Sequence, residues 1–229
     1  MKRIGLIGGM SWESSAVYYQ LLNQEVNALL GGTHSCDCIM DSVDFAQVEG
    51  LQHEGKWEEL CILMKEKAMS LAKAGAEIIL LCTNTMHICA EKLTEDLDAS
   101  FLHIADATAQ EILALGLERV GLLGTRFTME EDFYTKPMHE KHQIEVITPD
   151  EIDRVAIHDC IYQELVRGIF SDKSRELFKR IIGELESKGA QGVILGCTEI
   201  PLLIKQEDVS IPVFDTTAIH VKSALKMAL

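Results

Sequence analysis

The sequence predicts an α/β protein made of two similar halves, each a small parallel sheet covered by helices. Three observations predict this fold: short apolar runs alternate with amphipathic stretches, an internal repeat divides the chain, and the length suits two small units. Continuous apolar strands between helices are typical of parallel sheets that are buried on both faces. With 229 residues, 47% of them hydrophobic and 25% charged, the chain has an ordinary globular composition.

The alternation of strand and helix patterns runs along the whole chain. Residues 4–7 form the first strand candidate, and Ser11 can cap the helix that follows until Gly31 stops it. A capping box is expected at Thr128 and Glu131, before another helix. The other expected elements are strands at 38–43, 78–81, 120–123, 193–195 and 213–214, and helices at 57–74, from 84, at 152–167 and at 174–188.

The internal repeat is carried by two pairs of segments. KRIGLIGG (2–9) matches ERVGLLGT (118–125), and GAEIILLCTNT (75–85) matches GAQGVILGCTE (189–199). The offsets, 116 and 114, are similar and in the same order, which indicates two halves of about 115 residues. The second alignment sets Thr83 opposite Cys197, each at a strand end, where open α/β sheets bind ligands.

Charge and cysteine content limit the partners and the compartment. The net charge of −15 argues against nucleic acid and anionic membrane as partners. The seven cysteines are odd in number and form no metal-binding spacing, so we expect reduced thiols and a cytoplasmic protein. No apolar run approaches the length of a membrane span. Dinucleotide, P-loop and HExxH motifs are missing, so we expect neither a cofactor nor a metal.

Small polar residues gather at the expected strand ends. Backbone N–H groups at helix starts attract carboxylates, and Thr and Asn side chains add donors and acceptors. Cys197 is the strongest candidate for chemistry, because the pKa of a thiol at a helix start falls from about 8.5 toward neutrality. Cys61, Cys89 and Cys160 are interpreted as small buried apolar residues. The candidate ligand-binding residues from strand-end chemistry are Asn84, Thr85, Thr125, Thr128 and Thr198.

Six segments are spread over nearly the whole chain: IGLIGGMSWESS (4–15), CTNTMH (82–87), FLHIADAT (101–108), LLGTRFTM (122–129), GCTEIP (196–201) and PVFDTTAIH (212–220). Together they resemble the aspartate/glutamate racemase family, the cofactor-independent amino-acid racemases. The resemblance implies two α/β halves related by a pseudo-two-fold axis, with the active site in the cleft between them. It places 1–104 and the returning segment 212–229 in the first half and 105–211 in the second, and it implies a homodimer.

The resemblance also implies a catalytic pair. Family members carry two cysteines on opposite sides of the substrate Cα, and the first usually reads Cys-Asn-Thr. Here Thr83 holds that position and Cys82 comes one residue too early. A shift of one residue along a strand turns a side chain to the other face. We therefore expect Cys197 as the base and Thr83 as a weaker acid/base, in an enzyme that prefers the L-enantiomer.

The substrate is predicted less directly. Alignment with the family carries Met10 and Gln52 over as substrate-binding residues. Gln52 and Val166 stand where aspartate racemases have an Arg and a Lys, so Arg126 is the alternative cation for a carboxylate. Glu199 replaces the His of glutamate racemases and points to the aspartate branch. Aspartate or glutamate is the leading substrate, and a neutral amino acid is the alternative.

Two other functions fit the same residues. A single cysteine where two are usual also suits a hydantoin racemase or a decarboxylase of prochiral acids, which would release carbon dioxide. A non-catalytic amino-acid-binding protein would have kept the cleft and lost one base. It would bind amino acids without exchanging their Cα protons.

Overall fold

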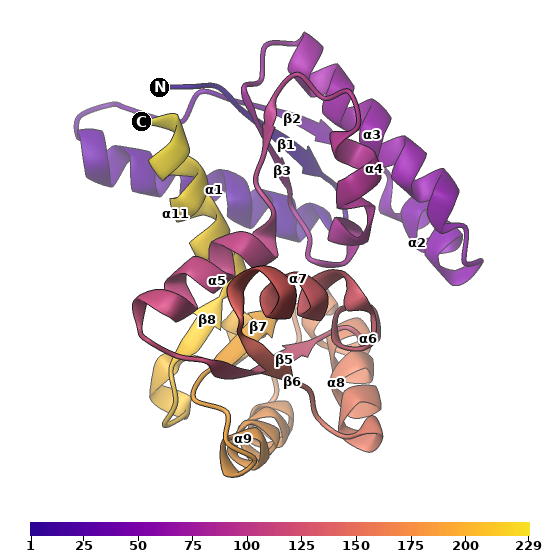
Figure 1. Ribbon diagram of the computed structural model, residues 1–229, viewed down its shortest axis with the longest axis vertical. Helices are drawn as coiled ribbons and strands as arrows, with labels where there is room; N and C mark the ends of the chain where they lie inside the picture. The colour runs from indigo at the N-terminus through magenta and orange to yellow at the C-terminus, as the bar shows by residue number, and fades with distance from the viewer. The chain divides into compact units, whose positions relative to one another are not determined.

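The computed structural model describes residues 1–229 and contains two four-stranded sheets in which all paired strands are parallel (Figure 1). The first sheet has the order β2-β1-β3-β4 and the second the order β6-β5-β7-β8. The predicted α/β fold with two similar halves is confirmed. The strands are β1 (Ile4–Gly8), β2 (Cys38–Ser42), β3 (Ile78–Leu81), β4 (Ser100–Phe101), β5 (Arg119–Gly124), β6 (Glu145–Ile147), β7 (Val193–Gly196) and β8 (Val213–Asp215).

The register of the strands repeats the sequence offsets. Gly5 of β1 is paired with Ile79 of β3, and Gly121 of β5 is paired with Val193 of β7. These pairs are related by the same two offsets that align the segments of the sequence. Counting forward from them, residue 83 in the first sheet occupies the position of residue 197 in the second. The strand register therefore gives Thr83 and Cys197 equivalent positions in the two sheets, as the sequence alignment does.

The two glycines of the repeat have the same packing role. A Cβ on Gly5 would lie 2.8 Å from the Cβ of Ala76 and 3.2 Å from that of Leu71. A Cβ on Gly121 would lie 2.8 Å from Cδ1 of Leu185. Leu71 and Leu185 belong to α3 (Trp57–Lys73) and α9 (Asp172–Ser187), the helices that precede β3 and β7. Glycine lets the corresponding helix approach each central strand.

The chain divides into two compact units. Unit 1 comprises residues 1–104 and 220–229, and unit 2 comprises residues 105–219. The segment 212–229, expected wholly with the first half, is split because β8 pairs with β7 in the second sheet. The remaining helices are α1 (Trp12–Leu30), α2 (Phe45–His53), η1 (Thr85–Cys89), α4 (Ala90–Thr94), α5 (Ile104–Ala114), α6 (Arg126–Glu130), α7 (Asp132–His142), α8 (Glu151–Gln163), η2 (Leu165–Arg167), α10 (Ile200–Leu203), η3 (Gln206–Asp208) and α11 (Thr216–Ala228).

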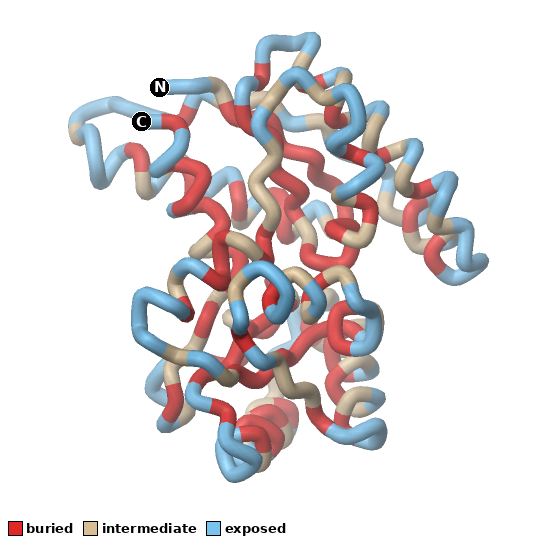
Figure 2. The backbone as a smooth tube through the Cα atoms, viewed as in Figure 1, coloured by how far each residue is buried: buried red, intermediate tan, exposed pale blue.

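Unit 1 buries its central strands on both faces, as Figures 1 and 2 show. Even-numbered residues such as Leu6 and Leu80 pack with α1 and α11, and odd-numbered residues such as Ile7 and Ile79 pack with α2 and α3. The alternation is that of a strand covered on both sides. In unit 2, β5 and β7 are also almost wholly buried.

Two predicted helix caps can be compared with the structure. Ser11 caps α1 as predicted, by accepting the N–H of Ser14. The predicted capping box of Thr128 and Glu131 is wrong, because Thr125 is the N-cap of α6 and the side chain of Glu131 caps nothing. No helix is long and apolar enough to cross a membrane.

The expectation of seven reduced thiols is also wrong. Cys61 of α3 and Cys89 of η1 form a disulfide, and the other five cysteines are free. Cys89 is buried as predicted, whereas Cys61 is only partly buried. The number of cysteines cannot reveal that Cys61 and Cys89 meet, because α3 and η1 become neighbours only in the folded unit.

Candidate active-site residues at the two sheet edges

The carboxyl edge of the first sheet collects five of the predicted site residues. All of them follow a strand directly or lie in the next helix. Thr83 is partly exposed, whereas the other four are buried in unit 1. They are Met10 after β1, Gln52 in α2, and Thr83, Asn84 and Thr85 after β3.

Met10 lies in a loop shaped by glycine. Gly9 has φ of 90°, and a Cβ there would come within 2.2 Å of the carbonyl oxygen of Val43. Its N–H donates to Oγ of Ser15 at 2.8 Å. A side chain at position 9 is excluded both by the backbone conformation and by the neighbouring strand. The Gly-Gly-Met-Ser segment thus has one tightly held path, and Met10 packs against the core that faces α2 and α3.

Cys82 and Thr83 have opposite surroundings. Cys82 is 0% exposed and packs with Tyr18, Leu22 and other residues of the α1 and α11 side of the core. Burial raises the pKa of its thiol above the range of an ordinary cysteine. The next residue, Thr83, is partly exposed. Cys82 therefore points into the core, as predicted for a residue one position before Thr83 along the strand.

Gln52 connects α2 with the segment after β3. Its amide Nε2 lies 3.3 Å from Sδ of Met86, and both side chains are buried. Met86 belongs to η1, whose first residue is Thr85 and whose N-cap is Asn84. The contact therefore places the Gln52 amide next to the loop that carries three predicted site residues.

The carboxyl edge of the second sheet carries a thiol beside a carboxylate. Cys197 directly follows β7 and is partly exposed. Its Sγ donates to Oε2 of Glu199 at 2.9 Å, and Oγ1 of Thr198 donates to the same oxygen at 2.7 Å. One carboxylate oxygen thus holds two neighbouring side chains. Sequence reasoning had used Glu199 only as a family marker, although a carboxylate two residues after a strand-end thiol is a readable signal.

The predicted lowering of the Cys197 pKa is wrong. Desolvation and the negative charge of Glu199 raise the pKa of the Cys197 thiol well above its ordinary value. The expected helix start gives little compensation, because α10 has only four residues and begins at Ile200. Cys197 therefore rests as a hydrogen-bonded thiol, and any reaction as a base requires its proton to move first.

Two further predicted residues lie after β5. Thr125 caps α6, and its Oγ1 accepts the N–H of Thr128 at 3.3 Å. The two hydroxyl oxygens are 3.2 Å apart, and Thr128 is completely buried. Together with Cys197 and Thr198, they bring all the predicted site residues of the second half to one edge of one sheet.

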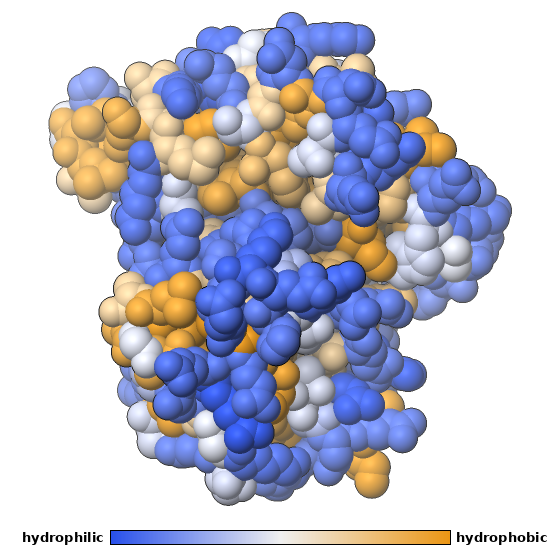
Figure 3. All heavy atoms as spheres, in the orientation of Figure 1, coloured by the Kyte–Doolittle hydropathy of each residue, from blue (hydrophilic) through white to orange (hydrophobic).

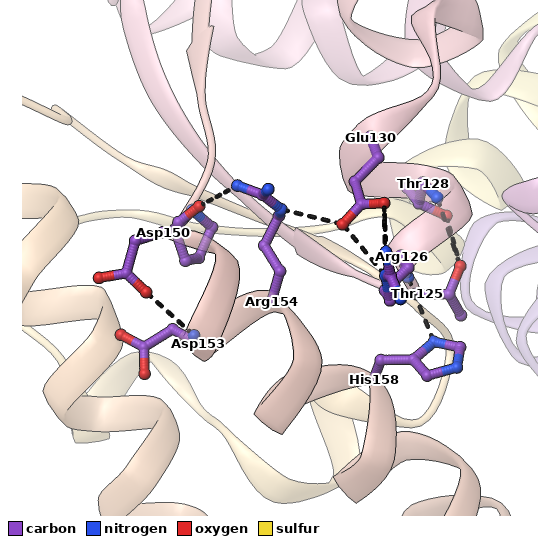
Figure 4. A network of polar contacts seen from close by, with 9 residues as sticks. Thr125, Arg126, Thr128, Glu130, Asp150, Asp153, Arg154 and His158 are labelled. Carbon is purple, nitrogen blue, oxygen red and sulfur yellow. Dashed lines mark hydrogen bonds and ion pairs between the residues drawn. The ribbon is translucent and has the colours of Figure 1, made fainter.

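Arg126, the alternative cation for a carboxylate, already has a carboxylate partner. Its Nε donates to Glu130 at 3.1 Å, and Nε of Arg154 donates to the same side chain at 3.1 Å (Figure 4). The backbone N–H of Arg126 donates to Nδ1 of His158 at 3.3 Å. The other expected positions are uncharged, since Gln52 and Val166 carry no cation. Much of the face drawn in Figure 3 is hydrophilic.

The two edges supply acid/base groups and neutral hydrogen-bonding groups. Thr83 and Cys197 stand at equivalent positions of the two sheets, with Asn84 and Thr85 following the first and Thr198 and Glu199 following the second. No group of three or more His, Cys, Asp or Glu side chains is arranged to hold a metal ion. A thiol and a hydroxyl are both groups that can take part in proton transfer.

Comparison with known proteins gives a uniform result. The family model described as Asp/Glu/Hydantoin racemase matches residues 7–224. A candidate Asp/Glu racemase from Yersinia pestis is 53% identical, with a TM-score of 0.94 over 100% of this chain and 99% of that one. An aspartate racemase homologue from Pyrococcus horikoshii is 37% identical, with a TM-score of 0.88 over 100% and 99%.

A full-length relative of known activity is more distant. The broad specificity amino-acid racemase RacX of Bacillus subtilis is 24% identical over 99% of this chain and 98% of that protein.

Proposed function

The chain belongs to the Asp/Glu/Hydantoin racemase family, and we propose that it racemises aspartate or glutamate without a cofactor, acting preferentially on the L-enantiomer. It is an isomerase of an amino-acid racemase family. The observation that carries the finer proposal is the register of the two sheets, which gives Thr83 and Cys197 equivalent positions. Two-base racemisation needs one acid/base group for each face of the substrate Cα.

The proposed reaction begins with the thiol of Cys197. Its proton passes to the carboxylate of Glu199, to which it is already hydrogen-bonded at 2.9 Å. The resulting thiolate removes the Cα proton of the L-amino acid and leaves a carbanion conjugated with the α-carboxylate. The hydroxyl of Thr83 protonates this carbanion from the opposite face, which gives the D-amino acid. Solvent returns a proton to Thr83, and Glu199 loses the one that it took up.

The preference for the L-enantiomer has a defined meaning in this scheme. The equilibrium constant of racemisation in water is one, so kcat/KM for the two directions must be equal. A thiol is a much better proton donor and acceptor than an aliphatic hydroxyl near neutral pH. The carbanion is therefore protonated mainly by Cys197. Because the thiol proton is shared with Glu199 and exchanges there with solvent, L-substrate exchanges its Cα proton with solvent more often than it inverts.

We propose that neutral groups hold the substrate. Met10, Gln52, Asn84 and Thr85 would do so in the first half, and Thr125, Thr128 and Thr198 in the second. Support comes from their position at the sheet edges and from the pairing of Arg126 with Glu130. Hydrogen bonds from amides, hydroxyls and backbone N–H groups are a recognised means of binding carboxylates.

Assembly and location stay predictions. A homodimer follows from the family resemblance, and its mass in solution can be measured by light scattering. The prediction of a cytoplasmic location rests on reduced thiols. The Cys61–Cys89 disulfide leaves five of the seven cysteines free.

The test is to offer the purified chain each enantiomer of aspartate and glutamate, then neutral amino acids and hydantoins, and to separate products by chiral chromatography. Conversion of both enantiomers of aspartate or glutamate to the racemate is expected. Release of carbon dioxide would indicate a decarboxylase. Thermal stabilisation by an amino acid without any Cα exchange in D₂O would contradict the proposal and indicate a binding protein.

A further inference from the structure

The imidazole of His87 lies between two backbone segments at the carboxyl edge of the first sheet. Its Nδ1 is 2.9 Å from the carbonyl oxygen of Thr83, and its Nε2 accepts the N–H of Ile104 at 3.2 Å. The side chain is 1% exposed. Thr83 follows β3 and Ile104 begins α5 after β4, so the ring connects the ends of two adjacent strands.

The two hydrogen bonds define the tautomer of His87. The N–H of Ile104 can only donate, so Nε2 must be the unprotonated nitrogen. The carbonyl of Thr83 can only accept, so Nδ1 must carry the proton and donate it. Neither nitrogen is left for a proton transfer to a substrate. His87 therefore cannot be a general acid or base while both bonds are intact.

The surroundings keep this ring neutral. Burial lowers the pKa of His87 well below the ordinary value, and His103 and His220 lower it further. The ring centroids of these two histidines lie 4.7 Å and 5.8 Å from that of His87. A second proton would have to displace the N–H of Ile104 from Nε2, and it would add a charge beside two other imidazoles.

We propose that His87 is a positioning residue for Thr83, an inference that rests on the proposed function. Thr83 stands beyond the regular part of β3 and before the five-residue 3₁₀ helix η1, so the sheet ladder does not hold its carbonyl. His87 holds it instead, on a ring that is packed from all sides. Fixing this peptide fixes the Cα–Cβ direction of Thr83 and thereby the path of its hydroxyl proton. A small misplacement of a reacting group costs orders of magnitude in rate.

Two variants separate the two hydrogen bonds. In His87→Asn the amide nitrogen takes the place of Nδ1 and keeps the donor toward Thr83. In His87→Gln the amide group takes the place of Nε2, so it keeps a partner for Ile104 and loses the donor toward Thr83. His220→Gln is the matched control. His220 is as deeply buried in the same cluster and bonds to Tyr18 and Leu102 without touching Thr83.

The experiment measures two rates for L-aspartate or L-glutamate in D₂O: formation of the D-enantiomer, and deuterium incorporation into recovered L-substrate. Inversion requires Thr83, whereas incorporation into the L-form requires Cys197 and Glu199 but not Thr83. We expect His87→Gln to lose inversion about 10- to 100-fold while incorporation stays within about twofold of wild type. His87→Asn should recover most of the inversion, and His220→Gln should leave the ratio of the two rates unchanged.

Each outcome is decisive. Equal losses of inversion and incorporation in His87→Gln and His87→Asn would show a structural role only and overturn the proposal. Unchanged inversion in His87→Gln would also overturn it. If His87→Gln does not fold, as judged by circular dichroism, His87→Ala, which also lacks the donor toward Thr83, takes its place: a ratio of inversion to incorporation that falls about 10-fold or more supports the proposal, and a wild-type ratio contradicts it. A wild-type chain that shows neither rate refutes the proposed function instead.

Discussion

The loops after β3 and β7 occupy equivalent positions in sheets of the same strand order, yet they hold their residues by different means. In the first loop a buried neutral imidazole bonds to the backbone of Thr83. In the second loop a carboxylate bonds to the side chain of Cys197. The two sheets share strand order and register, whereas the side chains at their carboxyl edges differ. Two unequal half-reactions are the expected consequence.

The largest expected effect comes from removing the thiol. Cys197→Ala should abolish both inversion and Cα exchange, with a loss of roughly 10³-fold or more, because general acid–base groups contribute about 10²–10⁴ in rate. Cys197→Ser is the matched control, since it keeps the size and a hydrogen-bonding atom but raises the pKa of the base. Chiral chromatography and NMR in D₂O measure the two rates. Retained exchange in Cys197→Ala would show that another residue is the base.

Changing the other edge should affect one half-reaction only. Thr83→Ala should lose inversion by about 10²-fold while deuterium still enters recovered L-substrate. Thr83→Ser keeps the hydroxyl and should retain much of the inversion. Thr83→Cys would place a thiol at each edge, so inversion should become faster and deuterium should also appear in recovered D-substrate. Full inversion in Thr83→Ala would remove Thr83 from the mechanism.

The carboxylate beside the thiol should have two separable effects. Replacing the negative charge in Glu199→Gln should lower the pKa of Cys197 toward the ordinary thiol range, because that charge contributes to the raised value. Alkylation by iodoacetamide at pH 7.5 should then become faster. Exchange of L-substrate should nevertheless fall about 10-fold or more, because the acceptor of the thiol proton is lost. If exchange rises with alkylation, Glu199 only restrains the thiol.

The smallest effect concerns stability at low pH. Burial lowers the pKa of His220 to about 4 in the folded chain, whereas an unfolded histidine titrates near 6.5. Between these values the unfolded state binds more protons, so stability is complete above about pH 6.5 and is lost as the pH falls toward 4. At pH 5 the loss is about 2 kcal/mol for such a histidine.

Urea unfolding at pH 7.5 and pH 5.0 measures this loss, with His220→Gln as the comparison. The variant should be less stable than wild type at pH 7.5, and the difference should shrink at pH 5.0. A difference that is the same at both pH values would show that His220 does not stay neutral in the folded chain.

The backbone of the site was predictable, and the electrostatics were not. The repeat was enough to give Thr83 and Cys197 equivalent positions in the two sheets, because the offset between matching segments equals the offset between the paired strands. The alternation of side chains along a strand predicted that Cys82 faces the core, and it lies there. The raised pKa of Cys197 escaped prediction because it depends on the rotamer of Glu199 and on burial, and neither has a sequence period.

Contacts between distant segments were the other limit. The pairing of Cys61 with Cys89 needs two helices to meet, and the bond from His87 to Ile104 needs two strand ends to meet. The Arg126–Glu130 pair was different, since its spacing of four residues on a helix is readable from the sequence.

The most direct test of the unequal edges follows deuterium from D₂O into each enantiomer of aspartate and glutamate at early times. From L-substrate, label should appear in recovered L-substrate faster than D-product forms. From D-substrate, labelled L-product should form while recovered D-substrate stays nearly unlabelled. Equal labelling of the two recovered substrates would contradict the account, and so would faster labelling of the D-form, because either result would make Thr83 at least as effective as Cys197.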